Sequence, residues 1–286
     1  MLRHHSLHED TGGPGPLQYP MLDLEFAELS DTGKVREHNE DYFGHVIPAT
    51  PEDGHAQGWL FVLADGVGGH DKGEVASRTA VESVLAGFRA SKAGEPHSAL
   101  LPRLVQTANV RVLETGMASG PGGANMATTM VSCALRFDRV VVAHVGDSRC
   151  YLIRRGEASI LTRDHTLAGE QVRLGLLSAG EAADSPNRHM LSRSLGAEMF
   201  VNVECNEHQV LVGDLLLLCS DGLHGALTPS EIAAIAANQQ DLNAAVQRLV
   251  AVANHHDGGD NVSVQLIRIR SVERVGMYRG RPYRLR

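Results

Sequence analysis

Short aliphatic runs recur along the chain, and they constrain the fold more than any other feature. Most are five to eight residues long, rich in aliphatic or β-branched side chains, and bounded by Gly, Asp or Pro. Such runs are typical of strands buried in a sheet. The predicted strands are Tyr42–Ile47, Trp59–Ala64, Thr129–Leu135, Val140–Val145, Cys150–Ile153, Asp214–Cys219 and Val262–Ile269. Asp138-Arg139 and Arg155-Gly156 are the predicted hairpin turns.

Helical periodicity occurs in two pairs of segments rather than once after each strand. The predicted helices are Glu74–Phe88, Leu100–Leu113, Pro229–Ala237 and Asp241–Ala253. Thr228 is a predicted N-cap, because Pro229 follows it at the first helical position. A doubly wound parallel sheet needs a helix between successive strands, so the paired helices disfavour it. The pattern favours an α+β sandwich with a largely antiparallel sheet core.

Composition excludes several classes of protein. The 286 residues are 43% hydrophobic and 21% charged, close to the soluble average, which excludes wholesale disorder. No apolar run approaches the ~20 residues of a membrane helix. The net charge of −8 argues against a general nucleic-acid binder. No pair of the four cysteines has C-x-x-C spacing, so we expect small buried thiols and a cytoplasmic location.

Both ends of the chain lie outside the periodic region. Residues 1–21 predict a flexible leader, because the Gly-Pro cluster at 11–16 cannot bury much surface. We expect one folded domain over 22–270 and a basic tail over 271–286. The last 17 residues, from Arg270, contain six Arg and one Glu. They fit either a solvated tail or a docking element for an anionic partner.

Aspartates stand at the ends of five predicted strands. Asp65 and Asp221, each followed by Gly, end aliphatic runs, and Asp147 follows a third run. Asp41 and Asp260 open two others. If 42–47 and 59–64 pair as a hairpin, Asp41 and Asp65 share one edge, and antiparallel pairing can bring Asp260 beside Asp221 or Asp147. Clustered carboxylates repel one another unless a cation lies among them. The spacing leaves plain Asp-Gly turns and a divalent-metal site both open.

Arg36 lies five residues before Asp41 and is predicted at the same edge. There it can neutralise the carboxylates or present its planar guanidinium to a phosphate dianion. A metal, an arginine and an acidic rim together suggest two-metal phosphoryl hydrolysis.

In their order along the chain, these residues resemble one known family. The motifs are Gly33-x-Val35-Arg36-x-x-Asn39-Glu40-Asp41, Ala64-Asp65-Gly66-Val67-Gly68-Gly69-His70, Ala127-Thr128-Thr129, Val145-Gly146-Asp147-Ser148-Arg149, Thr162-x-Asp164-His165, Cys219-Ser220-Asp221-Gly222-Leu223 and Asp260-Asn261-Val262-Ser263. The chain resembles the type 2C metal-dependent Ser/Thr protein phosphatases of the bacterial kind over about residues 23–270. The resemblance implies a four-layer α-β-β-α sandwich with two largely antiparallel sheets.

The resemblance also implies two Mn²⁺ or Mg²⁺ ions at one end of the sandwich, with a third, weaker ion possible. By motif position, Asp65 would bridge both core ions, and the Gly66 carbonyl would bind one of them. Asp221 and Asp260 would complete the other. Asp147, together with Asp221, would hold the third ion.

The remaining site residues follow from the same motifs. Asp41 and Glu40 would hold metal-bound waters or a metal, and Arg36 would bind the substrate phosphate. A flap beside the site would run from about Thr166 to Arg188. Eukaryotic members carry a possible general acid two residues after the bridging aspartate, where this chain has Val67. His70, three residues further on, is the possible general acid here; alternatively, it orders its loop through a backbone hydrogen bond.

The implied activity is hydrolysis of phosphoserine and phosphothreonine in proteins. A metal-bridging hydroxide would attack phosphorus in line, without a phospho-enzyme. We therefore expect a monomeric signalling enzyme that acts on phosphorylated proteins and opposes a bacterial Ser/Thr kinase. Two alternatives remain: a catalytically silent module that binds phosphoproteins, and another two-metal hydrolase such as a phosphodiesterase.

Two conspicuous polar residues have simpler interpretations. His165 is predicted to hydrogen-bond a turn rather than bind a metal, and Arg149 to pair with acidic residues. The fifteen histidines show no H-E-x-x-H spacing, so no zinc site is predicted.

Overall fold

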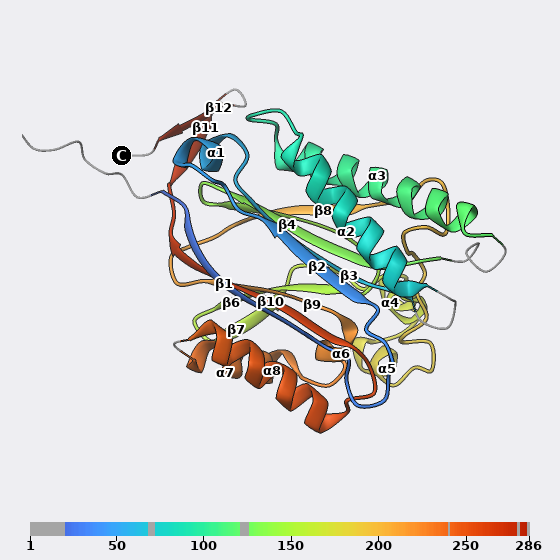
Figure 1. Ribbon diagram of the computed structural model, residues 1–286. Coiled ribbons are helices and arrows are strands. Elements are labelled where there is room, and N and C mark those ends of the chain that lie inside the picture. Colours follow the sequence, from blue (N-terminus) through green and yellow to red (C-terminus); the bar gives the residue numbers. More distant parts are fainter. Residues whose placement is uncertain (1–20, 68–71, 121–125, 240, 279–280, 285–286) are drawn as a thin grey trace, which may run out of the picture.

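Two five-stranded antiparallel sheets lie face to face in the computed structural model, which describes residues 21–67, 72–120, 126–239, 241–278 and 281–284 (Figure 1). The first sheet has the order β2 (Asp41–Val46), β3 (Trp59–Asp65), β4 (Met130–Arg136), β5 (Arg139–Val145) and β8 (Glu204–Gln209). The second has the order β1 (Asp23–Asp31), β10 (Val262–Ser271), β9 (Leu215–Cys219), β6 (Arg149–Arg154) and β7 (Glu157–Ile160).

A pair of long helices covers the outer face of each sheet, which confirms the four-layer sandwich (Figure 1). The helices α2 (Gly73–Arg89) and α3 (His97–Ala118) pack on the first sheet. The helices α7 (Pro229–Asn238) and α8 (Leu242–His256) pack on the second. Four short helices connect the layers: α1 (Pro51–Ala56), α4 (Leu167–Arg173), α5 (Ala179–Ala183) and α6 (Asp221–His224). Among the described residues, no helix is long and apolar enough to cross a membrane.

Because both sheets are covered on both faces, their central strands carry apolar residues on both faces. Along β3, Leu60 and Val62 pack under α2 and α3, whereas Phe61 and Leu63 point into the space between the sheets. In β9, Leu217 likewise packs under α7 and α8, and its neighbours face the other sheet. Side chains of successive strand residues point to opposite faces, so one strand contributes to two apolar layers.

The helix and hairpin ends adopt local structures that the sequence predicts, with one shift of a single residue. Thr228 caps α7 in a reciprocal capping box with Glu231. Arg155 and Gly156 both have positive φ, as a tight hairpin between β6 and β7 requires. The turn between β4 and β5 begins one residue earlier than predicted, at Phe137, whose φ is +61°.

Several elements lie outside the predicted set. Strand β1 and the edge strands β7 and β8 mix charged with apolar residues and are only partly buried, so their sequences lack an aliphatic run. The segment predicted as a basic tail folds into a hairpin of β11 (Val275–Tyr278) and β12 (Arg281–Arg284). Its start is buried at Val272 and Val275, so the prediction of a solvated tail from 271 is wrong there.

Truncation of the core beneath α7 and α8 should destabilise the whole domain. Leu217 is fully buried, so Leu217→Ala should lower the free energy of unfolding by about 2–5 kcal/mol. Urea unfolding followed by circular dichroism measures this loss. Leu176→Ala is the matched control, because that side chain is 69% exposed, and it should change stability by less than ~0.5 kcal/mol. Equal losses in both variants would contradict the assigned layers.

Candidate active site

Hairpin pairing of β2 with β3 places Asp41 directly opposite Asp65. This register confirms the predicted shared edge. Two threonines that directly precede β4 hold the end of β3 in place. The Thr129 hydroxyl accepts from the Asp65 amide at 3.1 Å, and Thr128 donates its hydroxyl to the Asp65 carbonyl at 2.7 Å. The Asp65 main chain is therefore fixed on both sides.

In the second sheet, the end of β9 approaches the start of β10. Gly222 comes so close to Asn261 that a Cβ on it would lie 2.1 Å from the Asn261 carbonyl oxygen. Glycine is therefore required directly after Asp221. The contact brings Asp221 beside Asp260. Burial, followed by repulsion from Asp260, raises the pKa of Asp221.

Asn261 and Ser220 join the two sheets at this end. The Asn261 side chain accepts from the Glu40 amide at 2.8 Å and donates to the Thr32 and His38 carbonyls. Ser220, which follows β9, donates its hydroxyl to Asp41 Oδ2 at 2.7 Å. Aspartates from five strand ends thus form one group, which we call the acidic centre: Asp41, Asp65, Asp147, Asp221 and Asp260.

Burial makes the acidic centre electrostatically costly. It raises the pKa of Asp41 to about 7 and of Asp147 to about 8, and neighbouring carboxylates add to both shifts. Burial, followed by the surrounding aspartates, also raises the pKa of Asp65 and Asp221. Asp41 Oδ1 is buried and has no hydrogen-bond partner among the described residues. Hard oxygen donors, one of them orphaned, fit divalent cations such as Mn²⁺ or Mg²⁺.

The acidic centre forms the floor of a cleft of about 1470 Å³. Six of the predicted site residues line the cleft: Arg36, Asp65, Gly66, Asp147, Asp221 and Asp260. Asp41 is buried behind Asp65. Glu40 extends toward Gly73 at the start of α2, because a Cβ on Gly73 would lie 2.8 Å from Glu40 Oε1. His70 lies outside the described residues.

Arg36 reaches the cleft from the loop between β1 and β2. Its Nη2 donates to Asp260 Oδ2 at 2.8 Å, and its side chain is 40% exposed. One bond to Asp260 leaves the other N–H donors of the guanidinium for a ligand. The arginine is thus held at the acidic centre and stays accessible.

Arg149 and Asp147 share the turn between β5 and β6. Arg149 donates two hydrogen bonds, of 2.9 and 2.6 Å, to the Asp164 carboxylate, which confirms its predicted pairing with an acid. His224 donates to the Asp147 carbonyl at 2.9 Å. These contacts position the turn that carries Asp147.

His144, His165 and Glu204 form a second cluster, with candidate ligand atoms within 4.8 Å of one another. His165 Nδ1 accepts from the Gly146 amide, so its proton is on Nε2, which faces Glu204 at 3.2 Å. The Arg193 guanidinium lies 3.3 Å from the same Nε2. A protonated nitrogen beside an arginine is a poor metal ligand. The cluster is instead a hydrogen-bond network, which confirms the prediction for His165.

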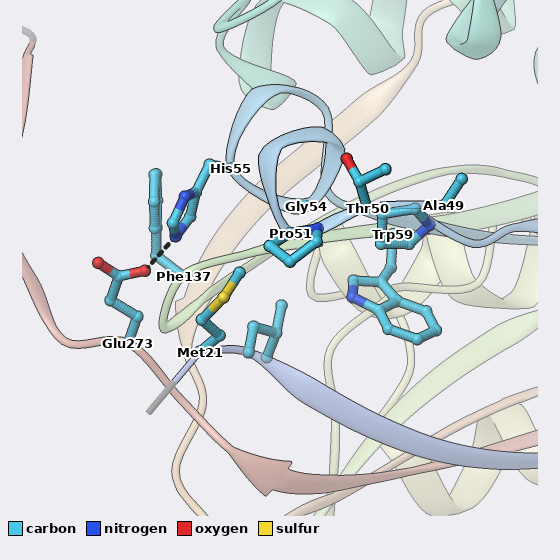
Figure 2. Close-up of a pocket in the computed structure, with 11 residues that line it drawn as sticks. Met21, Ala49, Thr50, Pro51, Gly54, His55, Trp59, Phe137 and Glu273 are labelled. Atoms are coloured by element: carbon cyan, nitrogen blue, oxygen red, sulfur yellow. Dashed lines mark hydrogen bonds and ion pairs between the residues drawn. The ribbon is translucent and has the colours of Figure 1, made fainter. Parts of the chain in front are cut away.

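A second pocket, of about 290 Å³, lies at the opposite end of β3, next to Trp59 (Figure 2). Its walls are mostly apolar, and Figure 2 shows His55 stacked on Phe137 and bonded to Glu273. Its lining has one carboxylate, Glu273, whereas five aspartates meet in the acidic centre. The chemistry of a divalent-metal site therefore belongs to the larger cleft.

One cleft residue close to the acidic centre, His189, was not predicted from the sequence. His189 Nδ1 lies 3.8 Å from Asp221 Oδ2, although it stands in a loop without periodicity. The loop is brought to the centre by the bridge between Thr166 and Leu191, a contact that no local pattern reveals. We call residues 166–191 the flap.

Comparison with known proteins gives one consistent result. The model of a family described as Protein phosphatase 2C matches residues 34–264. The chain is 33% identical to the serine/threonine phosphatase stp of Listeria innocua, over 88% of this chain and 96% of that one. It is 31% identical to a serine/threonine phosphatase structure from S. agalactiae, with a TM-score of 0.79 over 87% and 100% of the two chains. The catalytic domain of the phosphatase PstP, solved with two manganese ions, is 29% identical, with a TM-score of 0.74 over 87% of this chain and 100% of that one.

The raised pKa values of Asp41 and Asp147 predict an unusual dependence of stability on pH. In metal-free protein the folded state binds more protons than the unfolded state, so stability should fall as the pH rises from about 4 to about 8. Saturating Mn²⁺ should remove most of this fall, because the ionised carboxylates then face a cation. Melting temperatures measured with chelator and with Mn²⁺ test this. A metal-free melting temperature that rises between about pH 5 and pH 8 would contradict it.

Proposed function

The chain belongs to the protein phosphatase 2C family and is a metal-dependent protein-serine/threonine phosphatase, and we propose that the acidic centre is its metal-binding active site. The observation that carries this proposal is the meeting of five buried or half-buried aspartates at one end of the two sheets. Divalent cations would balance such a concentration of ionised carboxylates, which lies open to a cleft beside the flap.

The ligands of the two core ions would come from both sheets. We assign Asp65 and the Gly66 carbonyl from the first sheet, and Asp221 and Asp260 from the second. When bound, the ions would supply a nucleophile at neutral pH and neutralise charge on the transferring phosphoryl group. Support for a ligand set shared between the sheets comes from the closeness of these carboxylates, because burial and then the charges of Asp41 and Asp221 raise the pKa of Asp65.

Three further acidic residues complete the assignment. Asp41, oriented by Ser220, and Glu40 would hold the water shell around the ions from behind. Asp147 would hold a third ion together with Asp221, and the repulsion between these two carboxylates supports this pairing. The role of His70 as general acid remains a prediction from the sequence.

Arg36 would bind the phosphate of the substrate. Its bond to Asp260 fixes one edge of the guanidinium, so the remaining donors can meet two phosphate oxygens at once. The group keeps its positive charge at any pH of interest. Arg36 would thereby orient the phosphorus toward the acidic centre.

The cellular setting is the less direct part of the proposal. A phosphatase for serine and threonine monoesters needs a Ser/Thr kinase that makes its substrate, so we infer a cognate kinase. Cys133, Cys150 and Cys219 are free and buried, which supports a reducing, cytoplasmic environment. The monomeric state and a role in signalling are predictions from the sequence and the family.

Removal of the Asp65 charge should abolish turnover. Asp65→Asn should lower kcat by a factor of about 10³ or more, because transition-state charge stabilisation by both ions is weakened. Mn²⁺-dependent phosphate release from a phosphothreonine peptide measures this, with a phosphodiester as a second substrate. Asp241→Asn is the matched control, since Asn also caps a helix and Asp241 lies at the start of α8. Full turnover in excess chelator would contradict the metal-dependent mechanism, and faster diester hydrolysis would favour a phosphodiesterase.

Arg36→Ala should act mainly on substrate binding. If the guanidinium holds the phosphate equally in the ground and transition states, KM should rise about tenfold or more, with a smaller change in kcat. Arg36→Lys should recover little, because a lysine lacks the two-pronged donor geometry. Steady-state kinetics with the same peptide measure both constants. An unchanged kcat/KM would mean that Arg36 only neutralises Asp260.

A further inference from the structure

The charged residues that line the cleft come from different parts of the chain and differ in sign. Asp257 and Asp260, on the wall formed by the end of α8 and the start of β10, are acidic. The flap forms another part of the lining and contributes Arg173, Arg188 and His189. A peptide that places its phosphate at the acidic centre therefore meets acidic residues from one part of the lining and basic residues from another.

Most arginines of the cleft are already bonded to carboxylates. Arg36 pairs with Asp260, Arg149 with Asp164, Arg163 with Glu204 and Arg173 with Glu170. Arg188 differs: its Nε donates to His189 Nε2 at 2.8 Å, and within the described part of the chain no acid pairs with it. Its two terminal nitrogens can therefore donate hydrogen bonds to a carboxylate of a bound peptide.

A turn with defined hydrogen bonds presents Arg188. The Ser185 carbonyl accepts from the Arg188 amide at 3.2 Å, and the Asn187 carbonyl accepts from the Met190 amide at 3.1 Å. The Met190 carbonyl then accepts from the Leu167 amide at 2.8 Å, which ties the turn to the first residue of α4. The arginine is thus held on a closed loop.

His189 links this turn to the acidic centre. Because its Nε2 accepts from Arg188, the proton of the neutral ring is on Nδ1, which faces Asp221 Oδ2 at 3.8 Å. Arg188 is therefore adjacent in the chain to His189, which lies beside the acidic centre.

We propose that Arg188 is a specificity-determining residue that binds a carboxylate next to the phosphorylated residue, so that acidic phosphopeptides are the preferred substrates. The inference rests on the proposed function. A guanidinium forms a two-pronged pair with a carboxylate. Acidic residues on the opposite side of the phosphorylated residue would face Asp257, which is not among the assigned metal ligands, and would be repelled. The preference should therefore be one-sided.

Matched phosphothreonine peptides test the proposal. One peptide carries Glu beside the phosphothreonine on one side, a second carries it on the other side, and a third has Gln at both places. For the wild-type protein, kcat/KM should be about fivefold or more higher for one of the Glu peptides than for the Gln peptide, mainly through KM. In Arg188→Gln this ratio should fall to about one, and Arg188→Lys should keep an intermediate preference.

Arg111→Gln is the control, because Arg111 is an exposed arginine on α3 that does not line the cleft, and it should keep the wild-type ratio. A peptide with phosphoserine in place of Glu shows whether a second phosphate is accepted equally. Hydrolysis of an aryl phosphate, which has no neighbouring residue, reports on the acidic centre alone, so its loss in wild type would contradict the proposed function instead. A wild-type protein without preference, or an Arg188→Gln variant with an unchanged ratio, would overturn the proposal.

Discussion

Repulsion among buried carboxylates is the constraint on which the rest of this structure depends. Asp41 and Asp65 face each other across a hairpin, and Asp221 reaches them from the other sheet. Left alone, these groups would favour either protonation or separation of the sheets. Ser220 and Asn261 hold them together by hydrogen bonds that cross between the sheets. The chain thus concentrates carboxylates whose ionised form bound cations would stabilise.

The sandwich provides the rigidity that such a centre needs. Three apolar layers, one between the sheets and one beneath each helix pair, fix the strand ends from which the aspartates project. Leu60 and Phe61 of β3 illustrate how one strand contributes to two layers. The flap, in contrast, is joined to the domain by a few loop contacts such as the bridge between Thr166 and Leu191. We therefore assign the chemistry to the rigid strand ends and substrate selection to the flap.

Much of this could be predicted from the sequence, because the informative patterns are local. Aliphatic runs located the central strands, and hairpin logic alone paired Asp41 with Asp65. The edge strand β1 and the hairpin β11–β12 were not predicted, since their stability comes from neighbours distant in sequence. For the same reason His189, just beyond the predicted flap, gave no signal: its place beside Asp221 is set by tertiary contacts of the flap.

The central claim is that the acidic centre holds two divalent cations. Anomalous diffraction at the manganese edge, from crystals grown with Mn²⁺, tests it most directly. The account predicts two strong peaks in the cleft, both in contact with Asp65, with Asp221 and Asp260 as ligands on the side of the second sheet. Peaks confined to the network of His144, His165 and Glu204, or a cleft without manganese at saturating concentration, would contradict it.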